Sequence, residues 1–226
     1  MNPPTRPLMS SDVAHKISTA GIIAVLVVDD IQNVRPLAEA LLNGGVDVVE
    51  LTLRTPAAWK AAQIMKADFP QITLGLGTLL TPGQVRTAVD MQVDFAVAPG
   101  CNPSVIKAAK EHGLSFAPGV ATPSDIELAV EHGCRVFKYF PAEASGGMNY
   151  LSAMAGPYSH LGLKFIPLGG LNESNIGNYL RSPLVVAIGG SWIATRSLIQ
   201  TQNWQQVTLN AQSIRAGIDG LRETNK

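Results

Sequence analysis

The sequence has no excess of charge of either sign. Its 226 residues include 17 lysines and arginines and 17 aspartates and glutamates, so the formal net charge is zero. A protein that attracts nucleic acid or an anionic membrane through its overall field needs a basic excess, which this chain lacks. Any anionic ligand must therefore be held by local geometry.

Cysteines and long apolar runs are also scarce. The two cysteines, Cys101 and Cys134, are too few for a disulfide framework, and their spacing fits no zinc motif. No apolar run approaches the roughly 20 residues that span a bilayer. We therefore expect a protein of a reduced, cytoplasmic compartment, in which both cysteines are packing residues.

The beginning of the chain is polar and rich in proline, and no apolar signal core follows it. We expect residues 1–9 to form a flexible tail. The length suits one large domain or two small ones, and we place a single domain at residues 10–226.

Short apolar runs alternate with helical patterns at intervals of about 20 to 30 residues, the length of a βα unit. The predicted strands are residues 21–28, 46–53, 72–77, 95–99, 114–120, 135–140, 164–168 and 185–188. Eight such units predict an α/β fold of the single (β/α)₈ TIM barrel type, with an extra N-terminal helix from Ser10 or Ser11 to Ser18. An open doubly wound sheet is the alternative, but no G-x-G-x-x-G fingerprint follows the first strand.

The helices of these units have recognisable starts. Thr55-Pro56, Thr81-Pro82 and Thr122-Pro123 each place a proline in the first helical turn, where its missing N–H costs nothing. A further helix is predicted from Thr201 to about Leu221.

A lysine interrupts the most apolar of the predicted strands. Residues 136–143 read Val-Phe-Lys-Tyr-Phe-Pro-Ala-Glu, with Lys138 in the middle. Burial removes hydration from an ammonium ion and favours the neutral amine, which is a nucleophile that forms Schiff bases with ketones and aldehydes. A lysine that extends its charge to water at the strand end is the alternative, and it needs no chemistry.

A carboxylate and a guanidinium end the second strand. Glu50, Thr52 and Arg54 alternate along it, so their side chains point to the same side and can face one cavity. Glu50 lies within an apolar run, where a lone carboxylate is costly unless it is paired or transfers protons. A structural ion pair between Glu50 and Arg54 is the other interpretation.

Other predicted strand ends supply polar groups and glycines. The third ends in Gly75-Leu76-Gly77-Thr78, the fourth in Ala98-Pro99-Gly100, and the last two run into Gly169-Gly170 and Gly189-Gly190-Ser191. Glycine-rich turns after the last two strands of a barrel, each running toward a helix N-terminus, can bind phosphate through backbone N–H groups.

Together these strand ends resemble the 2-keto-3-deoxy-6-phosphogluconate aldolase family, which also acts on 4-hydroxy-2-oxoglutarate. The resemblance extends from about Ile22 to Ala194. It is carried by residues 49–54 (Val-Glu-Leu-Thr-Leu-Arg), 75–78 (Gly-Leu-Gly-Thr), 98–100 (Ala-Pro-Gly), 137–143 (Phe-Lys-Tyr-Phe-Pro-Ala-Glu) and 188–192 (Ile-Gly-Gly-Ser-Trp).

The resemblance implies roles for these residues. Lys138 would form the Schiff base and Glu50 would be the general acid and base, whereas Arg54 and Thr78 would bind the carboxylate of the pyruvate portion. The remaining substrate-binding residues that it implies are Pro99, Phe140 and the phosphate-binding Gly169, Gly170, Gly190 and Ser191.

The resemblance also implies a lyase of the Entner–Doudoroff pathway that assembles as a homotrimer, has a phosphorylated 2-keto acid as its substrate, and needs no metal or other cofactor. One departure from the family pattern matters: Leu168 stands where the family typically has threonine. A leucine cannot supply the hydroxyl, so 2-keto-3-deoxy-6-phosphogalactonate and 4-hydroxy-2-oxoglutarate remain alternative substrates.

Two functions of other classes also remain. A metal-dependent aldolase would need a ligand cluster, but the four histidines lie away from the predicted strand ends (His15, His112, His132 and His160). A non-catalytic protein that binds a phosphate ligand could use the same fold and the same glycines. It would not need a lysine near Glu50 and Arg54.

Overall fold

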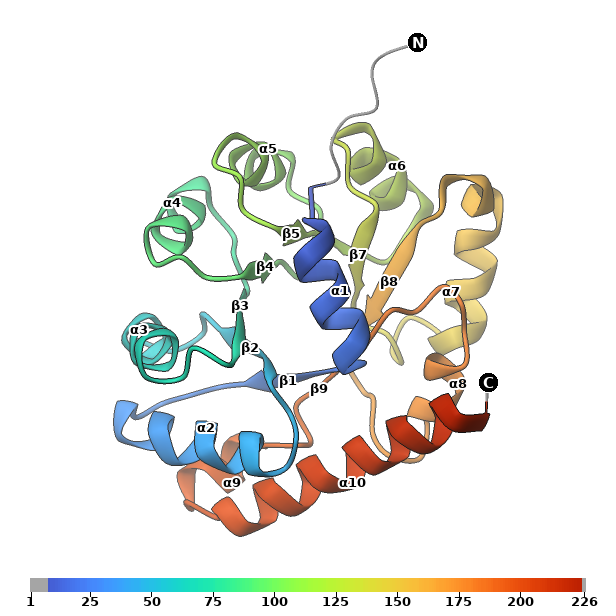
Figure 1. Ribbon diagram of the computed structural model, residues 1–226. Helices are drawn as coiled ribbons and strands as arrows, with labels where there is room; N and C mark the ends of the chain where they lie inside the picture. Colours follow the sequence, from blue (N-terminus) through green and yellow to red (C-terminus); the bar gives the residue numbers. More distant parts are fainter. Residues whose placement is uncertain (1–7, 225–226) are drawn as a thin grey trace.

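The computed structural model describes residues 8–224 as alternating strands and helices (Figure 1). The strands are β1 (Ile22–Leu26), β2 (Val48–Thr52), β3 (Thr73–Gly77), β4 (Phe95–Val97), β5 (Phe116–Ala117), β6 (Gly119–Val120), β7 (Val136–Tyr139), β8 (Lys164–Pro167) and β9 (Ile188–Gly190). The α-helices are α1 (Ser11–Ala20), α2 (Val34–Asn43), α3 (Ala58–Asp68), α4 (Pro82–Asp90), α5 (Pro103–Glu111), α6 (Pro123–Glu131), α7 (Gly147–Ala155), α8 (Ile176–Leu180), α9 (Arg196–Gln200) and α10 (Trp204–Thr224). Two short 3₁₀ helices are η1 (Ile31–Asn33) and η2 (Gly156–Leu161).

The described strands form two parallel sheets. The first has six strands in the order β5-β4-β3-β2-β1-β9, and the second has three in the order β6-β7-β8. Single parallel bridges join Phe165 to Val185 and Leu168 to Gly189, so the end of β8 lies beside β9. Figure 1 shows the strands curling around a common centre with most helices outside them. The predicted α/β class with parallel strands is confirmed, and full closure into one eight-stranded barrel stays a prediction.

The segment predicted as one strand at residues 114–120 is divided in the structure. Its first part, β5, pairs with β4, and its second part, β6, pairs with β7. Pro118 lies between them and has no N–H to donate to a ladder. The interruption therefore separates the two sheets at this point.

Two of the three predicted Thr-Pro pairs start helices through side-chain caps. Thr81 and Thr122 form capping boxes with Gln84 and Asp125, directly before the prolines that begin α4 and α6. The prediction for Thr55-Pro56 is wrong in detail, because α3 begins only at Ala58 and has no side-chain cap. The Thr55 hydroxyl donates instead to the carbonyl of Val28, in the loop after β1.

The extra N-terminal helix is α1. Ser10 caps it by accepting a hydrogen bond from the N–H of Val13, and Gly21, with φ of 72°, ends it. The helix crosses the centre of the ring of strands (Figure 1). Its buried Ile17 belongs to a cluster with residues at the beginnings of β1, β2 and β4 (Ile23, Val48 and Phe95). Helix α1 therefore covers the end of the ring at which the strands begin.

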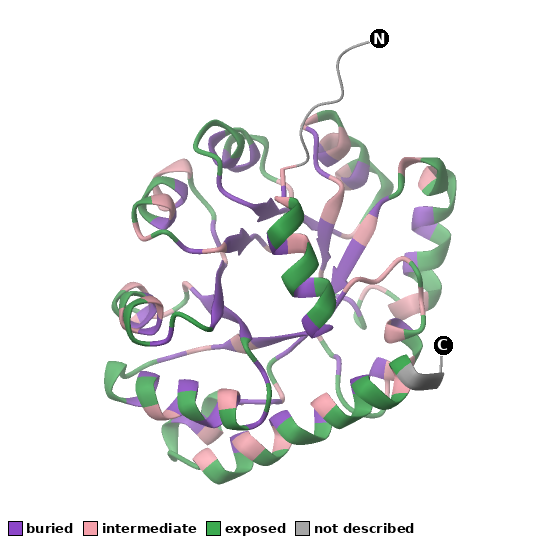
Figure 2. Ribbon diagram, in the orientation of Figure 1, coloured by how far each residue is buried: buried purple, intermediate pink, exposed green. Residues whose placement is uncertain are grey.

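A second and larger core lies between the strands and the outer helices. Figure 2 shows it as buried segments along the strands and on the inward sides of the helices. The predicted helix at residues 201–221 is α10, whose Thr208 hydroxyl donates to the carbonyl of Ala40 in α2 at 3.0 Å. No helix in the described part of the chain is long and apolar enough to cross a membrane.

Residues 1–7 of the predicted tail lie outside the described residues. Met9, which we also placed in the tail, is 5% exposed and packs in the cluster under α1. The tail prediction is therefore wrong for Met9, because its apolar side chain is covered on folding.

Candidate active site

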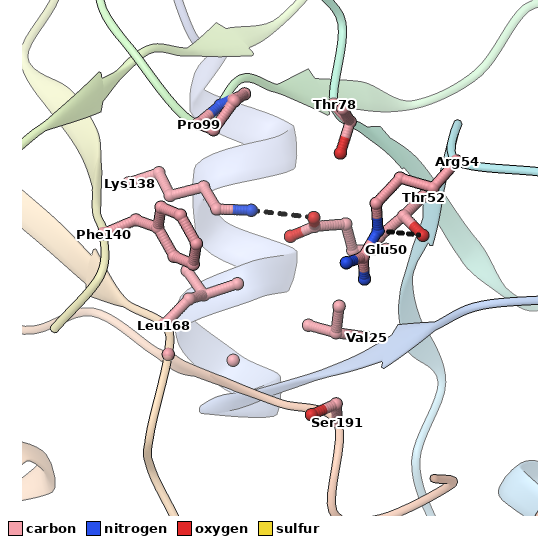
Figure 3. Close-up of a pocket in the computed structure, with 12 residues that line it drawn as sticks. Val25, Glu50, Thr52, Arg54, Thr78, Pro99, Lys138, Phe140, Leu168 and Ser191 are labelled. Atoms are coloured by element: carbon pink, nitrogen blue, oxygen red, sulfur yellow. Dashed lines mark hydrogen bonds and ion pairs between the residues drawn. The ribbon is translucent and has the colours of Figure 1, made fainter. Parts of the chain in front are cut away.

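A cavity of about 400 Å³ opens at the end of the ring where the strands finish (Figure 3). Most of the predicted site residues meet there although they are far apart in the sequence. The lining residues are Val25, Glu50, Thr52, Arg54, Thr78, Pro99, Lys138, Phe140, Leu168, Gly169, Gly189 and Ser191.

Lys138 of β7 and Glu50 of β2 form a buried ion pair in this cavity. Their Nζ and Oε1 atoms are 2.8 Å apart, and the side chains are 7% and 1% exposed. Lys138 therefore does not extend its charge to water, and Glu50 pairs with Lys138 rather than with Arg54. Each charge offsets much of the cost of burying the other.

The second carboxylate oxygen of Glu50, Oε2, is buried and has no hydrogen-bond partner within the described residues. Such an oxygen is costly unless something binds it. It is therefore available to a water or to a substrate group in the cavity.

The wall around the lysine is apolar. The Nζ atom lies 5.5 Å from the centre of the Phe140 ring, within the range of a cation–π contact. Pro99 and Leu168 complete this side of the cavity (Figure 3). Water is excluded from much of the surface around Nζ, which strengthens the electrostatic interactions there.

The carboxylate of Glu50 depends on a glycine in the neighbouring strand. A Cβ atom at Gly77 of β3 would lie only 2.1 Å from Glu50 Oε1. The next residue, Thr78, lines the cavity with φ of 64°, a left-handed conformation that threonine rarely adopts. Such strain is kept only where the surrounding structure imposes it, and it often occurs at functional sites.

A chain of hydrogen bonds positions Arg54. The hydroxyl of Thr52 donates to the carbonyl of Leu26 at 2.9 Å and accepts from Arg54 Nε at 3.3 Å. The terminal nitrogens of Arg54 point into the cavity near Glu50 (Figure 3). Glu50, Thr52 and Arg54 thus line the same cavity, as their alternation predicts.

The predicted phosphate-binding residues are only partly brought together. Gly169 and Ser191 line the cavity, but Gly170 and Gly190 do not. Gly190 pairs with Ala24 in the ladder between β1 and β9, and a Cβ atom on it would lie 1.9 Å from the ring of Trp192. Gly189 takes its place in the lining.

Several lining residues were not predicted. Thr52 could have been found from its alternation with Glu50 and Arg54, and Gly189 from its place beside Gly190. Val25 lies within the apolar run of β1 and carries no signal of its own. Leu168 was noticed only as a departure from a family pattern.

The two cysteines lie outside the cavity lining. Burial raises the pKa of the Cys101 thiol to about 11 and that of Cys134 to about 12, so both are protonated at neutral pH. This agrees with a packing role. Within residues 8–224, no group of three or more histidines, cysteines, aspartates or glutamates could hold a metal ion.

Comparison with known proteins identifies the family. The sequence model of the KDPG and KHG aldolases, named for 2-keto-3-deoxy-6-phosphogluconate and 4-hydroxy-2-oxoglutarate, matches residues 13–209. The chain is 38% identical over 198 residues to a 2-dehydro-3-deoxy-phosphogluconate aldolase of Haemophilus influenzae, covering 88% of this chain and 92% of that relative. It is 36% identical over 210 residues to a KHG/KDPG aldolase of Escherichia coli K12, covering 92% and 96%.

A solved relative extends the likeness to three dimensions. The crystal structure of a KDPG aldolase from Legionella pneumophila, with pyruvate captured as a covalent carbinolamine, is similar with a TM-score of 0.85 at 36% identity. The match covers 89% of this chain and 97% of that one. This chain therefore belongs to the KDPG and KHG aldolase family.

Proposed function

We propose that this protein is a class I aldolase that cleaves 2-keto-3-deoxy-6-phosphogluconate to pyruvate and glyceraldehyde 3-phosphate through a Schiff base on Lys138. One observation carries the proposal: a buried lysine and a buried glutamate, 2.8 Å apart, share a cavity with an arginine. These are a nucleophile, a proton-transfer group and a carboxylate anchor, the three parts that Schiff-base chemistry on a keto acid requires. The covalent pyruvate adduct of the Legionella relative supports the same chemistry.

In the first step the lysine becomes neutral and attacks. A proton passes from Nζ to Glu50 Oε1 along their hydrogen bond, which leaves a neutral amine and a carboxylic acid without changing the total charge. The amine adds to the ketone carbon of the substrate as the C=O π bond opens, and a proton moves from the nitrogen to the oxygen to give a carbinolamine. Glu50, directly or through a water, returns a proton to the departing hydroxyl, and loss of water gives a protonated imine.

The substrate carboxylate is held at the mouth of the cavity. Because Arg54 Nε is already bonded to Thr52, the two terminal nitrogens of the guanidinium are left for the carboxylate. The Thr78 hydroxyl adds a further donor, while Pro99 and Phe140 confine the ketone between them. These contacts fix the plane in which the lysine attacks.

The carbon–carbon bond breaks on the protonated imine. Glu50 takes the proton from the substrate hydroxyl at C4, the C3–C4 electron pair moves onto the imine as an enamine, and an aldehyde leaves. Protonation of the enamine carbon followed by hydrolysis of the imine releases pyruvate and restores the amine. One group thus serves as base and as acid in successive steps.

The phosphate end of the substrate would be held by Gly169, Gly170, Gly190 and Ser191. Gly169 and Ser191 support this, because they lie at the ends of the two strands that border the same cavity. Binding energy from this distant group can be used to orient the bond that breaks.

A second set of substrates is favoured by one residue. Leu168 is 4% exposed, lines the cavity and packs directly on Gly189, so this wall offers no hydroxyl to the substrate. A related activity on 2-keto-3-deoxy-6-phosphogalactonate or 4-hydroxy-2-oxoglutarate is therefore the alternative. Relative values of kcat/KM for the three substrates decide between them.

We also propose the finer organisation of the molecule. Residues 10–226 would form one domain whose parallel strands close into a (β/α)₈ barrel, and three copies would assemble into a cytoplasmic homotrimer that acts on a phosphorylated 2-keto acid. The bridge between Leu168 and Gly189 supports closure, and the two free cysteines support a reducing compartment. Light scattering tests the trimer by the mass of the assembly.

The test of the proposed function is intact mass after incubation with pyruvate and sodium borohydride. We expect the wild type to gain one reduced pyruvate adduct and Lys138→Ala to gain none. Lys164→Ala is the matched control, because Lys164 also lies in a strand but donates to the carbonyl of Pro183 outside the cavity, and it should keep the adduct. If the wild type formed no adduct, the Schiff-base mechanism would be wrong and a phosphate-binding protein or a metal-dependent aldolase would be favoured.

A further inference from the structure

The Gly169–Gly170 turn after β8 is held through its carbonyl groups. The Gly169 carbonyl accepts from the N–H of Glu143 at 3.0 Å, and the Gly170 carbonyl accepts from Asn175 Nδ2 at 3.1 Å. In a planar trans peptide the N–H of the next residue points opposite to the carbonyl. The N–H groups of Gly170 and Leu171 therefore point away from these partners, and successive N–H groups on one side of a turn can bind an anion.

The turn also rests on the side chain of Glu143. A Cβ atom at Gly170 would lie 2.7 Å from Glu143 Cβ, and Gly170 has φ of 83°, so only glycine fits there. The residues just before Glu143 and Gly169 are also bonded, because the N–H of Ala142 donates to the carbonyl of Leu168 at 2.8 Å. A shift of Glu143 would therefore move the turn.

Glu143 is in turn held by a tyrosine. The hydroxyl of Tyr179, a buried residue of α8, donates to Glu143 Oε1 in a short hydrogen bond. Burial, and then the Glu143 carboxylate, raise the pKa of Tyr179 well above its usual value. The hydroxyl thus stays protonated and donates throughout the neutral pH range.

This pair lies outside the reaction cavity. Glu143 and Tyr179 line a separate hollow of about 250 Å³ between the loop after β7 and α8, and neither lines the cavity that holds Lys138. They therefore do not touch the reacting atoms. Their connection to the cavity runs through Gly169, which lines it, and Gly170.

We propose that Glu143 and Tyr179 are positioning residues that fix the Gly169–Gly170 turn for the phosphate at the far end of the substrate. The inference rests on the proposed function and goes beyond it, because it assigns a role to a side-chain pair outside the cavity. A purely structural pair would stabilise the fold without distinguishing substrates. Loss of a positioning pair raises KM for substrates with a phosphate and leaves the kinetic constants of substrates without one unchanged.

The test compares 2-keto-3-deoxy-6-phosphogluconate with 4-hydroxy-2-oxoglutarate, which has no phosphate. For Tyr179→Phe and Glu143→Ala we expect KM for the phosphorylated substrate to rise about tenfold, the size of one lost hydrogen bond. We expect kcat for this substrate to change less than KM does, and both constants for the other substrate to stay within about twofold. Glu143→Gln keeps an oxygen that can accept from Tyr179, so it should keep KM within about threefold of the wild type.

The matched control is Tyr158→Phe. Tyr158 donates to Glu127 at 2.8 Å, so the chemical change is the same, but neither residue lines the reaction cavity. This variant should leave KM unchanged for both substrates. An equal rise of KM for both substrates in Tyr179→Phe, or no rise beyond that of Tyr158→Phe, would overturn the proposal.

Direct binding separates this proposal from the proposed function. Calorimetry with 3-phosphoglycerate as the probe measures the phosphate site without any turnover, and we expect about tenfold weaker binding to Tyr179→Phe. The pyruvate adduct on Lys138 should form equally in this variant and the wild type. Unchanged binding of the probe would overturn the positioning role, whereas a missing adduct in the wild type would overturn the Schiff-base function alone.

Discussion

At the scale of single residues, Lys138 and Glu50 depend on each other. Both side chains are almost removed from water, and a buried charge without its partner costs several kcal/mol. Moving one proton along their 2.8 Å hydrogen bond turns the ion pair into a neutral amine and a neutral acid. The pair can thus supply a nucleophilic lysine without leaving an unpaired charge in the interior.

This dependence predicts the effect of Glu50→Gln. The amide keeps an oxygen that can accept from Lys138 but cannot take up a proton, so kcat should fall by about 10² to 10⁴, the usual contribution of general acid–base catalysis. Steady-state cleavage measures the loss, and thermal denaturation measures stability. The loss of turnover should far exceed the loss of stability, because the amide oxygen still accepts a hydrogen bond from Lys138 and Nζ is not left without a partner.

The control for this prediction is Glu39→Gln, at an exposed position of α2. It should change neither turnover nor stability. Wild-type activity in Glu50→Gln would instead make Glu50 a structural residue.

Replacing Arg54 should weaken substrate binding more than it slows the chemical steps. Arg54→Lys replaces a planar fork by a single ammonium ion, which cannot bind a carboxylate through two parallel hydrogen bonds. We expect KM to rise about tenfold with a smaller change in kcat, and the pyruvate adduct still to form. Arg35→Lys, in a surface ion pair with Asp68, is the matched control and should leave KM unchanged.

At the scale of elements, β2 and β3 determine where the buried carboxylate of Glu50 lies. Their register pairs Glu50 with Gly75 and Thr52 with Gly77, so a glycine without a side chain lies beside each polar residue. The carboxylate of Glu50 occupies the space where a side chain of Gly77 would be. The position of the Glu50 carboxylate thus depends on the absence of a side chain at Gly77 in the neighbouring strand.

Gly77→Ala tests this arrangement. The new methyl group would lie 2.1 Å from Glu50 Oε1, so the carboxylate must move away from Lys138. We expect kcat to fall about 10²-fold or more, because misplacement by about 1 Å is costly in catalysis. Rates of aldol cleavage and of adduct formation measure the effect.

A glycine in an open position provides the comparison. Gly217 lies on the exposed side of α10, and nothing is within 4 Å of its ideal Cβ position. Gly217→Ala should keep full activity and raise the free energy of unfolding by about 0.5–1 kcal/mol. Equal activities for the Gly77 and Gly217 variants would contradict the arrangement.

At the scale of the whole molecule, the two ends of the ring of strands have different tasks. Helix α1 covers the end where the strands begin, while the reaction cavity opens at the end where they finish. In (β/α)₈ barrels, whose strands run parallel as they do here, stability is associated with the first end and chemistry with the second. The two properties should therefore respond to different substitutions.

Ile17→Ala tests this separation. Ile17 is a fully buried residue of α1 that faces the strands. Its truncation should lower the free energy of unfolding by about 2–5 kcal/mol. The activity of the folded protein should stay within about twofold of the wild type. Urea denaturation measures the stability and steady-state kinetics measure the activity of the same sample. A large loss of kcat in the fully folded variant would contradict the separation of the two ends.

The sequence predicted the alternation of strands and helices because apolar runs and proline-bearing helix starts are local signals. Thr81-Pro82 and Thr122-Pro123 begin helices as predicted. The same signal was wrong at Thr55-Pro56, because the Thr55 hydroxyl bonds the Val28 carbonyl and α3 begins only at Ala58. The strand predicted at residues 114–120 is also divided, because Pro118 has no N–H to donate. In both places a contact elsewhere in the molecule or a missing donor overrides the pattern.

The sequence by itself singled out Lys138 and Glu50 as candidates for the chemistry, because a lysine and a glutamate within apolar strands are costly unless they are used or paired. The sequence could not determine which group pairs with each of these two side chains. Glu50 bonds Lys138, 88 positions away, rather than Arg54 on its own strand, and Gly189 rather than Gly190 borders the cavity. These outcomes depend on the curvature of the sheet and on which side of each strand faces inward, and only the tertiary structure decides both.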